Sequence, residues 1–157
     1  MVEPWLDPVL GPCACSQIRK TARAVSALYD GFLAKAGLTV TQYAILVNIA
    51  RRKDESLSRT SLAALLGMDR TTLTRNLRPL ERDKLVEPMP SDDRRTSLIR
   101  LTPAGTKRLA KAFRQWEKVQ RDFQQKFGAT RLNDLAKLLQ SASETAAHLR
   151  ASDSQDA

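Results

Sequence analysis

Apolar residues recur three and four positions apart along most of the chain, a spacing that is typical of amphipathic α-helices. The first such set runs from Ile18 through Val25 to Ala36, with polar residues between its members. The predicted helices cover residues 16–36, 40–53, 58–66, 70–84, 103–127 and 129–150. A mainly helical fold is therefore expected.

Capping residues indicate where these helices begin and end. The candidate N-caps are Thr39 or Thr41, Ser58 or Thr60, Asp69, and Thr102 with Pro103 at the favoured first position. Gly37, Gly67 and Gly128 stand where three of the helices should stop. The polar tail, residues 151–157, is expected to be disordered.

The period of the pattern changes after residue 84. Residues 85–89 and 96–101 are short and rich in apolar residues, as in β-strands, and the polar segment 90–95 between them predicts a turn. These residues predict a hairpin with a charged tip that contains Asp93, Arg94 and Arg95.

The segment from Ser61 to Val86 has the spacing of a helix-turn-helix. Ala63 is small enough for two helices to cross closely, Gly67 suits a tight turn, and Leu73 is an apolar anchor of the second helix. With the hairpin that follows, this segment predicts a winged helix-turn-helix.

The second helix of this motif should bury its leucines and expose a basic face. The exposed set comprises Arg70, Thr71, Thr72, Thr74, Arg75 and Arg78. Arginine can bond guanine edges or phosphates, and threonine can bond phosphate or touch a thymine methyl. The further candidate DNA contacts are Thr60, Ser61, Asp93, Arg94 and Arg95. The alternative is an ordinary helix pair with a solvated basic face. Pro79 predicts a bend beyond the part that would read bases.

Charge supports a polyanionic partner. The 157 residues include 26 Lys and Arg against 17 Asp and Glu, a net charge of +9.

There is one His, and we find no phosphate-binding glycine loop and no metalloprotease or hydrolase motif, so neither an enzyme nor a cofactor is expected. No apolar run reaches the ~20 residues of a membrane span. Without a secretory signal or a disulfide framework, we expect a cytoplasmic protein.

The motifs resemble those of the MarR family of bacterial regulators. The carriers are LAALLGMDRTTLTRNLRPLERDKLV at 62–86, DDRRTSLIRLTPAG at 92–105, and GLTVTQYAIL at 37–46. In the second of these, Asp93, Arg95, Leu101, Thr102 and Gly105 match the family's Asp-x-Arg wing tip and its Leu-Thr-x-x-Gly. Together these segments extend the resemblance over nearly the whole chain.

This resemblance implies a homodimer that is joined by its first and last helices and places two winged lobes on double-stranded DNA. The apolar stripes of those helices agree, because a wide apolar stripe needs a partner surface. Candidate dimer residues are Ile18, Val25, Leu135, Leu139 and Leu149. The expected regions are 1–37 (arm and dimerisation helix), 38–102 (winged helix-turn-helix), 103–150 (dimerisation helices) and 151–157 (tail).

Two cysteines lie at the start of the first helix. A helix N-terminus stabilises a thiolate, and Arg19 lies one turn beyond Cys15, so a reactive thiol is one interpretation of Cys13 and Cys15. The other is that both are small apolar side chains in a dimer contact or a ligand pocket. A metal site within one chain would lack ligands, because the single His148 is distant in sequence.

The same region resembles organic-hydroperoxide sensors of the OhrR type. Cys15 falls on their reactive cysteine and Tyr29 on one of the two tyrosines that hold it, but Val40 stands at the other. The family resemblance also implies an effector pocket between the first helices and the winged lobe. Tyr29 and Tyr43 are candidates to line this pocket, and core packing is the alternative for both.

These observations predict a sequence-specific DNA-binding transcriptional regulator. The family resemblance implies a repressor released from its operator by a small phenolic or other aromatic effector. One alternative is an oxidant-sensing regulator that uses Cys15. Another is an architectural protein that binds DNA constitutively.

Overall fold

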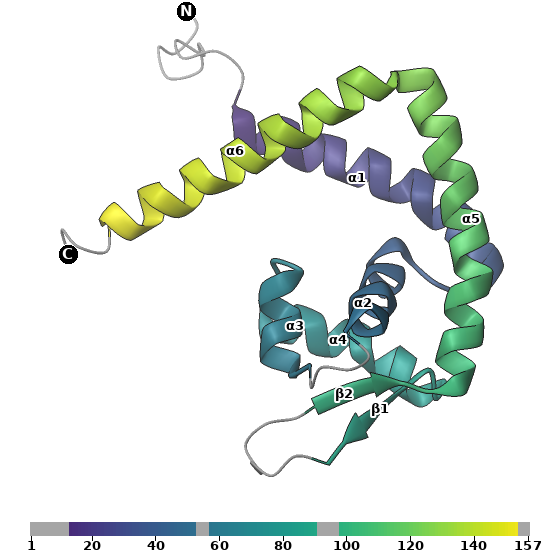
Figure 1. Ribbon diagram of the computed structural model, residues 1–157. Coiled ribbons are helices and arrows are strands. Elements are labelled where there is room, and N and C mark those ends of the chain that lie inside the picture. Colours follow the sequence, from purple (N-terminus) through teal and green to yellow (C-terminus); the bar gives the residue numbers. More distant parts are fainter. Residues whose placement is uncertain (1–12, 53–56, 91–97, 154–157) are drawn as a thin grey trace, which may run out of the picture. The chain divides into compact units, whose positions relative to one another are not determined.

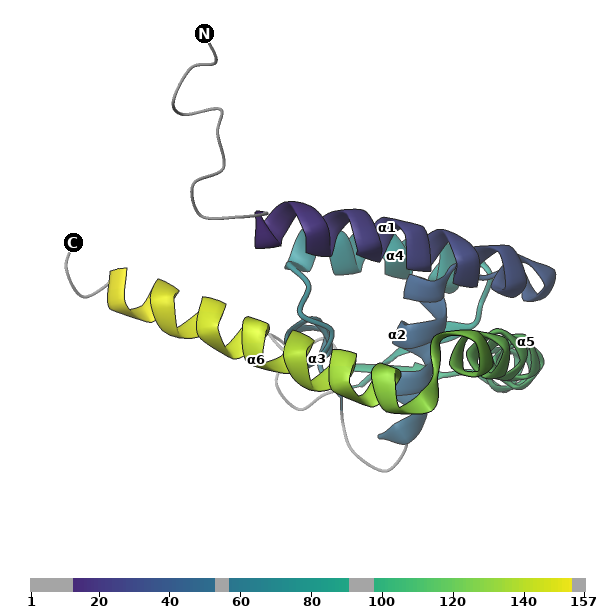
Figure 2. The ribbon, with the colours of Figure 1, turned by 90° about the horizontal axis from the view of Figure 1, so that it is seen from above.

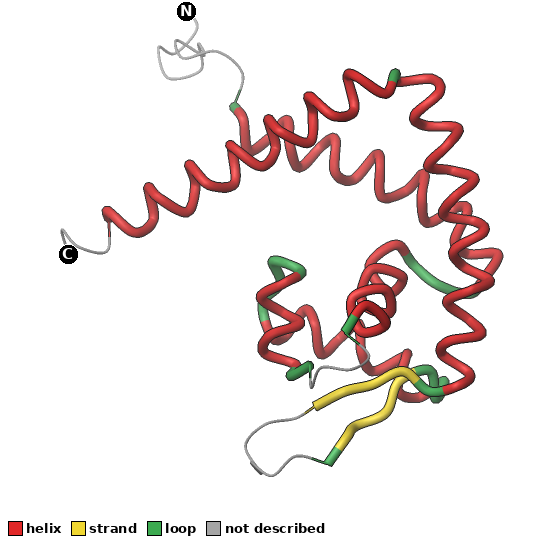
Figure 3. Tube along the Cα trace, viewed as in Figure 1, coloured by secondary structure: helices red, strands yellow, loops and turns green. Residues whose placement is uncertain are grey.

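The computed structural model describes residues 13–52, 57–90 and 98–153 of the chain (Figure 1). Its elements are α1 (Ala14–Leu33), the 3-10 turn η2 (Ala34–Ala36), α2 (Val40–Arg51), α3 (Arg59–Leu65), α4 (Arg70–Arg82), β1 (Val86–Met89), β2 (Leu98–Leu101), α5 (Pro103–Phe127) and α6 (Ala129–Asp153). Figure 3 shows helices throughout and one pair of strands. The predicted fold, mainly α with a β-hairpin wing, is confirmed.

The chain forms two compact units, Met1–Trp116 and Glu117–Ala157, with the boundary inside α5. In the first unit the core lies among the end of α1, α2, the α3–α4 pair and the hairpin. Its largest fully buried side chains are Leu33, Ile45, Leu46, Leu62, Leu73, Leu77 and Leu80. Burial of each leucine contributes about 1.5–3 kcal/mol, so these contacts fix the helix-turn-helix against α2.

Side-chain caps start the helices where the sequence predicted. Thr39 and Gln42 form a capping box at α2, Ser58 accepts the Ser61 N–H at 3.0 Å, and Thr102 accepts the Gly105 N–H at 2.9 Å. Of the two pairs of alternatives, Thr39 and Ser58 are therefore the caps. Each cap satisfies an amide that helix geometry leaves without a partner.

Several helix ends differ from the predicted ones. The first helix begins at Ala14 and gives way to η2 at Ala34, which places Cys15 inside its first turn. The fourth ends at Arg82, and Lys84 takes a positive φ of 54°. The last helix continues past residue 150 to Asp153, where the Ser152 hydroxyl bonds back to the Leu149 carbonyl at 2.9 Å. Helix propagation adds one hydrogen bond per residue, so polar composition alone does not end a helix.

A polar corner holds α2 against its neighbours in the first unit. The Asp30 carboxylate accepts the Val40 N–H at 2.6 Å, which places a negative charge at the N-terminus of α2. The Arg108 guanidinium of α5 donates to the Ala36 carbonyl at 3.2 Å. This corner therefore links α1, α2 and the first half of α5.

The hairpin is antiparallel, with Val86 opposite Leu101 and Met89 opposite Leu98. The first strand is shorter than predicted, since β1 begins at Val86, and the described part of the second strand runs from Leu98 to Leu101. The Ile99 N–H also bonds to the Leu57 carbonyl at 3.1 Å, so the segment before α3 lies beside β2. The predicted tip residues Asp93, Arg94 and Arg95 lie outside the described residues.

No single helix in the described ranges is long and apolar enough to cross a membrane. The segments Ala14–Ala36 and Val40–Arg51 meet the criterion only as a pair bent by 70°. The larger apolar side chains of α2 that are buried in the core, Tyr43, Ile45, Leu46 and Ile49, account for much of the apolar composition of that segment.

In the second unit, α6 is one unbroken helix (Figures 1 and 2). None of its described side chains is buried, and Leu138, Leu139 and Leu149 are 68%, 45% and 59% exposed. A helix that exposes this much leucine needs a covering surface.

Candidate nucleic-acid interface

The helix-turn-helix has the geometry that its spacing predicted. Gly67 has a φ of 60°, and the Met68 N–H bonds to the Ala63 carbonyl at 2.9 Å to close the turn after α3. Ala63 and the anchor Leu73 are 4% and 2% exposed. Because residues with a side chain rarely adopt this φ, Gly67 sets the angle at which α4 leaves the turn.

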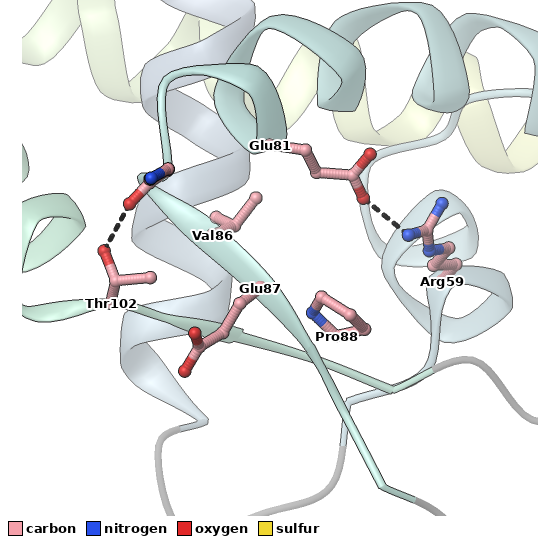
Figure 4. Close-up of a pocket in the computed structure, with 7 residues that line it drawn as sticks. Arg59, Glu81, Val86, Glu87, Pro88 and Thr102 are labelled. Carbon is pink, nitrogen blue, oxygen red and sulfur yellow. Dashed lines mark hydrogen bonds and ion pairs between the residues drawn. The ribbon is translucent and has the colours of Figure 1, made fainter.

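Two side-chain contacts tie α3 to α4. Arg59 pairs with Glu81, as Figure 4 shows, and Arg70 donates to the Thr60 hydroxyl at 3.3 Å. Arg59 was not among the predicted site residues. The sequence could have indicated its role, because Arg59 stands at the first position of a helix. A cation there is repelled by the positive end of the helix dipole and needs another partner.

A stripe of polar side chains runs along the exposed face of α4. These residues line a shallow, open groove and comprise Arg70, Thr71, Thr74, Arg75 and Arg78. Among the described residues, the groove therefore contains five of the six predicted residues of this helix and no carboxylate. Arg75 and Arg78 are exposed and make no hydrogen bond or ion pair within the described part of the chain. Their charge is thus available to an external anion. We call these five residues the α4 stripe.

Polar side chains in and beside the α4 stripe have partners within the helix. Thr72, the sixth predicted residue, is half-buried and donates to the Asp69 carboxylate at 2.6 Å. The Thr74 hydroxyl donates to the Arg70 carbonyl at 2.7 Å, and the Asn76 amide, which the sequence did not single out, donates to the Thr72 carbonyl at 2.9 Å. These bonds fix rotamers before any ligand arrives, while each threonine oxygen can still accept a bond.

Asp69 is the N-cap of α4. It accepts the Thr72 N–H at 2.7 Å, and hydrogen bonds from the Thr72 side chain and backbone lower the pKa of its carboxyl. The resulting carboxylate offsets the positive end of the helix dipole. The groove-lining half of α4 is therefore held at its first turn as well as by its leucines.

Thr60 and Ser61 occupy the first turn of α3, and both are exposed. The Ser61 hydroxyl lies 2.9 Å from that of Ser58. A helix N-terminus with hydroxyls is suited to bind a backbone phosphate. Their contact with DNA stays a prediction.

The segment after α4, the hairpin and α5 meet at a close junction. The Thr102 hydroxyl donates to the Lys84 carbonyl at 2.7 Å, shown in Figure 4, and the Thr102 N–H bonds to the Leu85 carbonyl at 3.1 Å. A Cβ on Gly105 would lie 1.9 Å from that Leu85 oxygen, so only glycine fits. This contact gives a physical reason for the Leu-Thr-x-x-Gly pattern.

Cys13 and Cys15 are both exposed in the single chain, so a buried position would require a partner surface. Cys15 and Tyr29 are fourteen residues apart on α1, about 21 Å along the helix axis. They therefore cannot touch within one chain. In the part of the chain that is described, no three His, Cys, Asp or Glu side chains are close enough to hold a metal ion.

Both candidate tyrosines pack in the core of the first unit. Tyr29 and Tyr43 are 9% and 7% exposed, and burial raises the pKa of each phenol. The Tyr43 ring stacks on Trp116, with 6.0 Å between the ring centroids. This burial agrees with core packing, and their contact with an effector stays a prediction.

These features define a winged-helix DNA-binding protein, and comparisons with known proteins agree. The MarR family profile matches residues 36–95. The transcriptional regulator MosR of M. tuberculosis, in complex with DNA, is 38% identical, covers 85% of this chain and 98% of its own, and has a TM-score of 0.73.

Two more distant structures share the fold. E. coli MarR without ligand is 22% identical, with a TM-score of 0.64 over 83% of this chain and 97% of its own. The transcriptional repressor CouR, bound to a 23-mer DNA duplex, is 22% identical, with a TM-score of 0.74 over 83% of this chain and 92% of its own. No curated protein matches the chain in a sequence comparison.

The chain belongs to the MarR family of DNA-binding transcriptional regulators. The family predicted from the motifs at 37–46, 62–86 and 92–105 is confirmed.

Proposed function

We propose that this regulator is a repressor that binds operator DNA as a homodimer and leaves it when a small effector, phenolic or otherwise aromatic, binds. The observation that carries the DNA-binding part is the α4 stripe, which presents three arginines and two threonines with no carboxylate. Arginine forks read guanine edges and hold phosphates, whereas threonine bonds phosphates or contacts thymine methyls. That MosR is seen with DNA supports the same use of the fold.

The proposed interface has two further parts. Thr60, Ser61 and Thr72 flank the α4 stripe and would contact phosphates. An arginine of the hairpin tip, Arg94 or Arg95, would enter the minor groove, where the potential is most negative, and Asp93 would brace its guanidinium. Residues 38–102 would thus form the DNA-binding region.

The proposed dimer contact lies on the first and last helices, in residues 1–37 and 103–150. On α6, the apolar residues Leu132, Leu135, Leu139, Ala142, Ala146 and Leu149 are spaced alternately three and four apart, the repeat of a helix–helix seam. On α1, Ile18 is 43% exposed and Val25 is half-buried. The occupant that suits these faces is a second copy of the chain, because a dimer also pairs two α4 stripes for two half-sites.

Selection from a randomised duplex library tests the proposed function. The wild-type protein should enrich an inverted repeat whose half-sites lie about one helical turn, 10 base pairs, apart. Binding without enrichment of any sequence would instead support an architectural DNA protein.

A second candidate signal is an oxidant, and the exposure of Cys15 in the first turn of α1 favours it. The Cys15 thiolate would attack the O–O bond of an organic hydroperoxide, with Arg19 one turn away, to give a sulfenic acid and an alcohol. Because Tyr29 cannot reach Cys15 within one chain, any contact between them would form across a dimer.

Operator release in organic hydroperoxide separates the two signals. If Cys15 is the sensor, wild type and Cys13→Ser should release DNA and Cys15→Ser should stay bound. If all three proteins respond alike, Cys15 is not the switch, and the aromatic effector becomes the favoured signal.

A further inference from the structure

Both ends of α4 are tied to the first turn of α3. At the start of α4, Arg70 donates to the Thr60 hydroxyl at 3.3 Å. In the last turn of α4, Glu81 pairs with Arg59, the first residue of α3 (Figure 4). Arg70 and Glu81 are eleven residues apart, about 16 Å along a helix axis. Because two adjacent residues of α3 hold both ends of α4, they restrict how α4 can tilt or slide against α3.

Pro79 gives the contact at Glu81 a particular role. Proline has no N–H, so α4 lacks the hydrogen bond that would run from position 79 to the Arg75 carbonyl. The missing bond lies at the end of the α4 stripe, before Glu81. Leu80 is 1% exposed, but apolar burial has no preferred direction. The charge-assisted hydrogen bond from Arg59 to Glu81 is directional, so it can fix the last turn of α4 where the backbone has lost a bond.

Arg59 is a costly residue if its role is stability alone. As the first residue of α3, it places a cation at the positive end of the helix dipole. Its Nε is buried and has no hydrogen-bond partner among the described residues, which also opposes folding. Glu87 lines the same open cavity but pairs with Arg100, so Glu81 is the carboxylate that Arg59 uses. The position that this pair gives to α4 therefore explains the arginine better than stabilisation does.

We propose that Arg59 is a positioning residue for DNA recognition. Through its pair with Glu81 it sets the orientation of α4, and with it the orientation of the α4 stripe in the groove of the DNA. Arg59 itself makes no DNA contact in this role. The proposal rests on the proposed function, in which the α4 stripe reads DNA. Base contacts require side chains in register with the base edges, so a small change in the angle of α4 weakens binding to one chosen sequence more than binding to DNA in general.

Removal of the Glu81 carboxylate tests the proposal, because charge and positioning predict opposite results. Glu81→Ala raises the net charge of the protein, so general electrostatics would tighten its binding to DNA. If the pair positions α4, fluorescence anisotropy should show about fivefold weaker binding to the duplex that wild type enriches from the randomised library. Binding to an unrelated duplex should be unchanged or tighter. Glu81→Gln, which keeps a neutral hydrogen bond to Arg59, should lose less affinity than Glu81→Ala.

Asp83→Ala is the matched control. It removes a carboxylate only two residues beyond Glu81, and the partner of Asp83 is the adjacent Arg82 rather than a residue of α3. This variant should bind both duplexes at least as tightly as wild type. Circular dichroism should show that the Asp83 and Glu81 variants are folded at the temperature of the binding assay.

Arg59→Ala separates positioning from a direct phosphate contact. It should weaken binding to the enriched duplex about as much as Glu81→Ala and leave the slope of log affinity against log salt concentration unchanged. Loss of a phosphate contact would instead reduce the magnitude of that slope by about 0.9. The double variant Arg59→Ala/Glu81→Ala should bind no more weakly than either single variant, because all three lack the same ion pair.

Three results would overturn the proposal: wild-type affinity of Glu81→Ala for the enriched duplex, an equal loss on both duplexes, or a reduced salt slope for Arg59→Ala. None of them affects the proposed function. That function would fail instead if the wild-type protein enriched no sequence from the library.

Discussion

Gly105→Ala should lose about 3 kcal/mol of folding stability, which lowers the melting temperature by roughly 6–12 °C. The new Cβ would lie 1.9 Å from the Leu85 oxygen and 3.1 Å from Leu101 Cδ2. The start of α5 must then move away from the strand, which stretches the bonds from Thr102 to the Lys84 and Leu85 carbonyls. A stretched buried bond costs about 1 kcal/mol in addition to the overpacking.

Gly31→Ala is the matched control. Gly31 is exposed on α1, and outside the adjacent backbone of its own helix no atom lies within 4 Å of the position that a Cβ would take. The same change should there stabilise the helix by about 0.5–1 kcal/mol. If the two variants melt alike, as followed by circular dichroism, the junction at Leu85 is not a close contact.

Leu139→Asp should raise the dissociation constant of the proposed dimer by at least about a hundredfold. The two symmetry-related leucines would each contribute about 1.5–3 kcal/mol on burial, and an unpaired carboxylate opposes burial further. Sedimentation velocity at micromolar concentration should then find a dimer for wild type and a monomer, or unfolded chain, for the variant.

Leu138→Asp provides the control on the adjacent residue. Leu138 is the most exposed leucine of α6, at 68%, but it lies outside the alternating three-and-four repeat that includes Leu135 and Leu139. This variant should therefore remain dimeric. Dissociation by Leu138→Asp alone would place the contact on the other face of α6, and a monomeric wild type would contradict the dimer.

The parts of the fold that the sequence predicted depend on near neighbours. The helix caps at Thr39 and Asp69 and the Gly67 turn each involve residues within about one helical turn, so their spacing is visible in the chain. Leu73, the helix-turn-helix anchor, was visible for the same reason, because its helix has one apolar face.

The parts that the sequence did not predict are contacts across elements. Arg59 and Glu81 are 22 residues apart, and the exclusion of a side chain at Gly105 depends on the backbone of Leu85 in another element. The apolar pocket lined by Ile49, Ile99 and Leu109 likewise combines residues of α2, the hairpin and α5. The spacing of apolar residues indicates which face of a helix or strand is buried. It does not indicate which residue of another element packs against that face.

The placement of Cys15 shows the same limit. The helix α1 begins at Ala14, two residues before the pattern that starts at Ser16, and therefore includes Cys15, which is exposed. A partner for the Cys15 thiol would have to come from the surface of another molecule. The spacing of residues within one chain does not predict that surface.

The affinity of Arg75→Ala for the selected duplex tests the central claim, that the α4 stripe reads DNA, most directly. By fluorescence anisotropy the variant should lose about 1–3 kcal/mol of binding free energy on that duplex and less on unrelated DNA, because a base contact is lost. Arg131→Ala, which removes the same charge from an exposed position on α6, should bind both duplexes as wild type does. An equal loss on both duplexes would make Arg75 a phosphate contact, and unchanged binding by Arg75→Ala would contradict the claim.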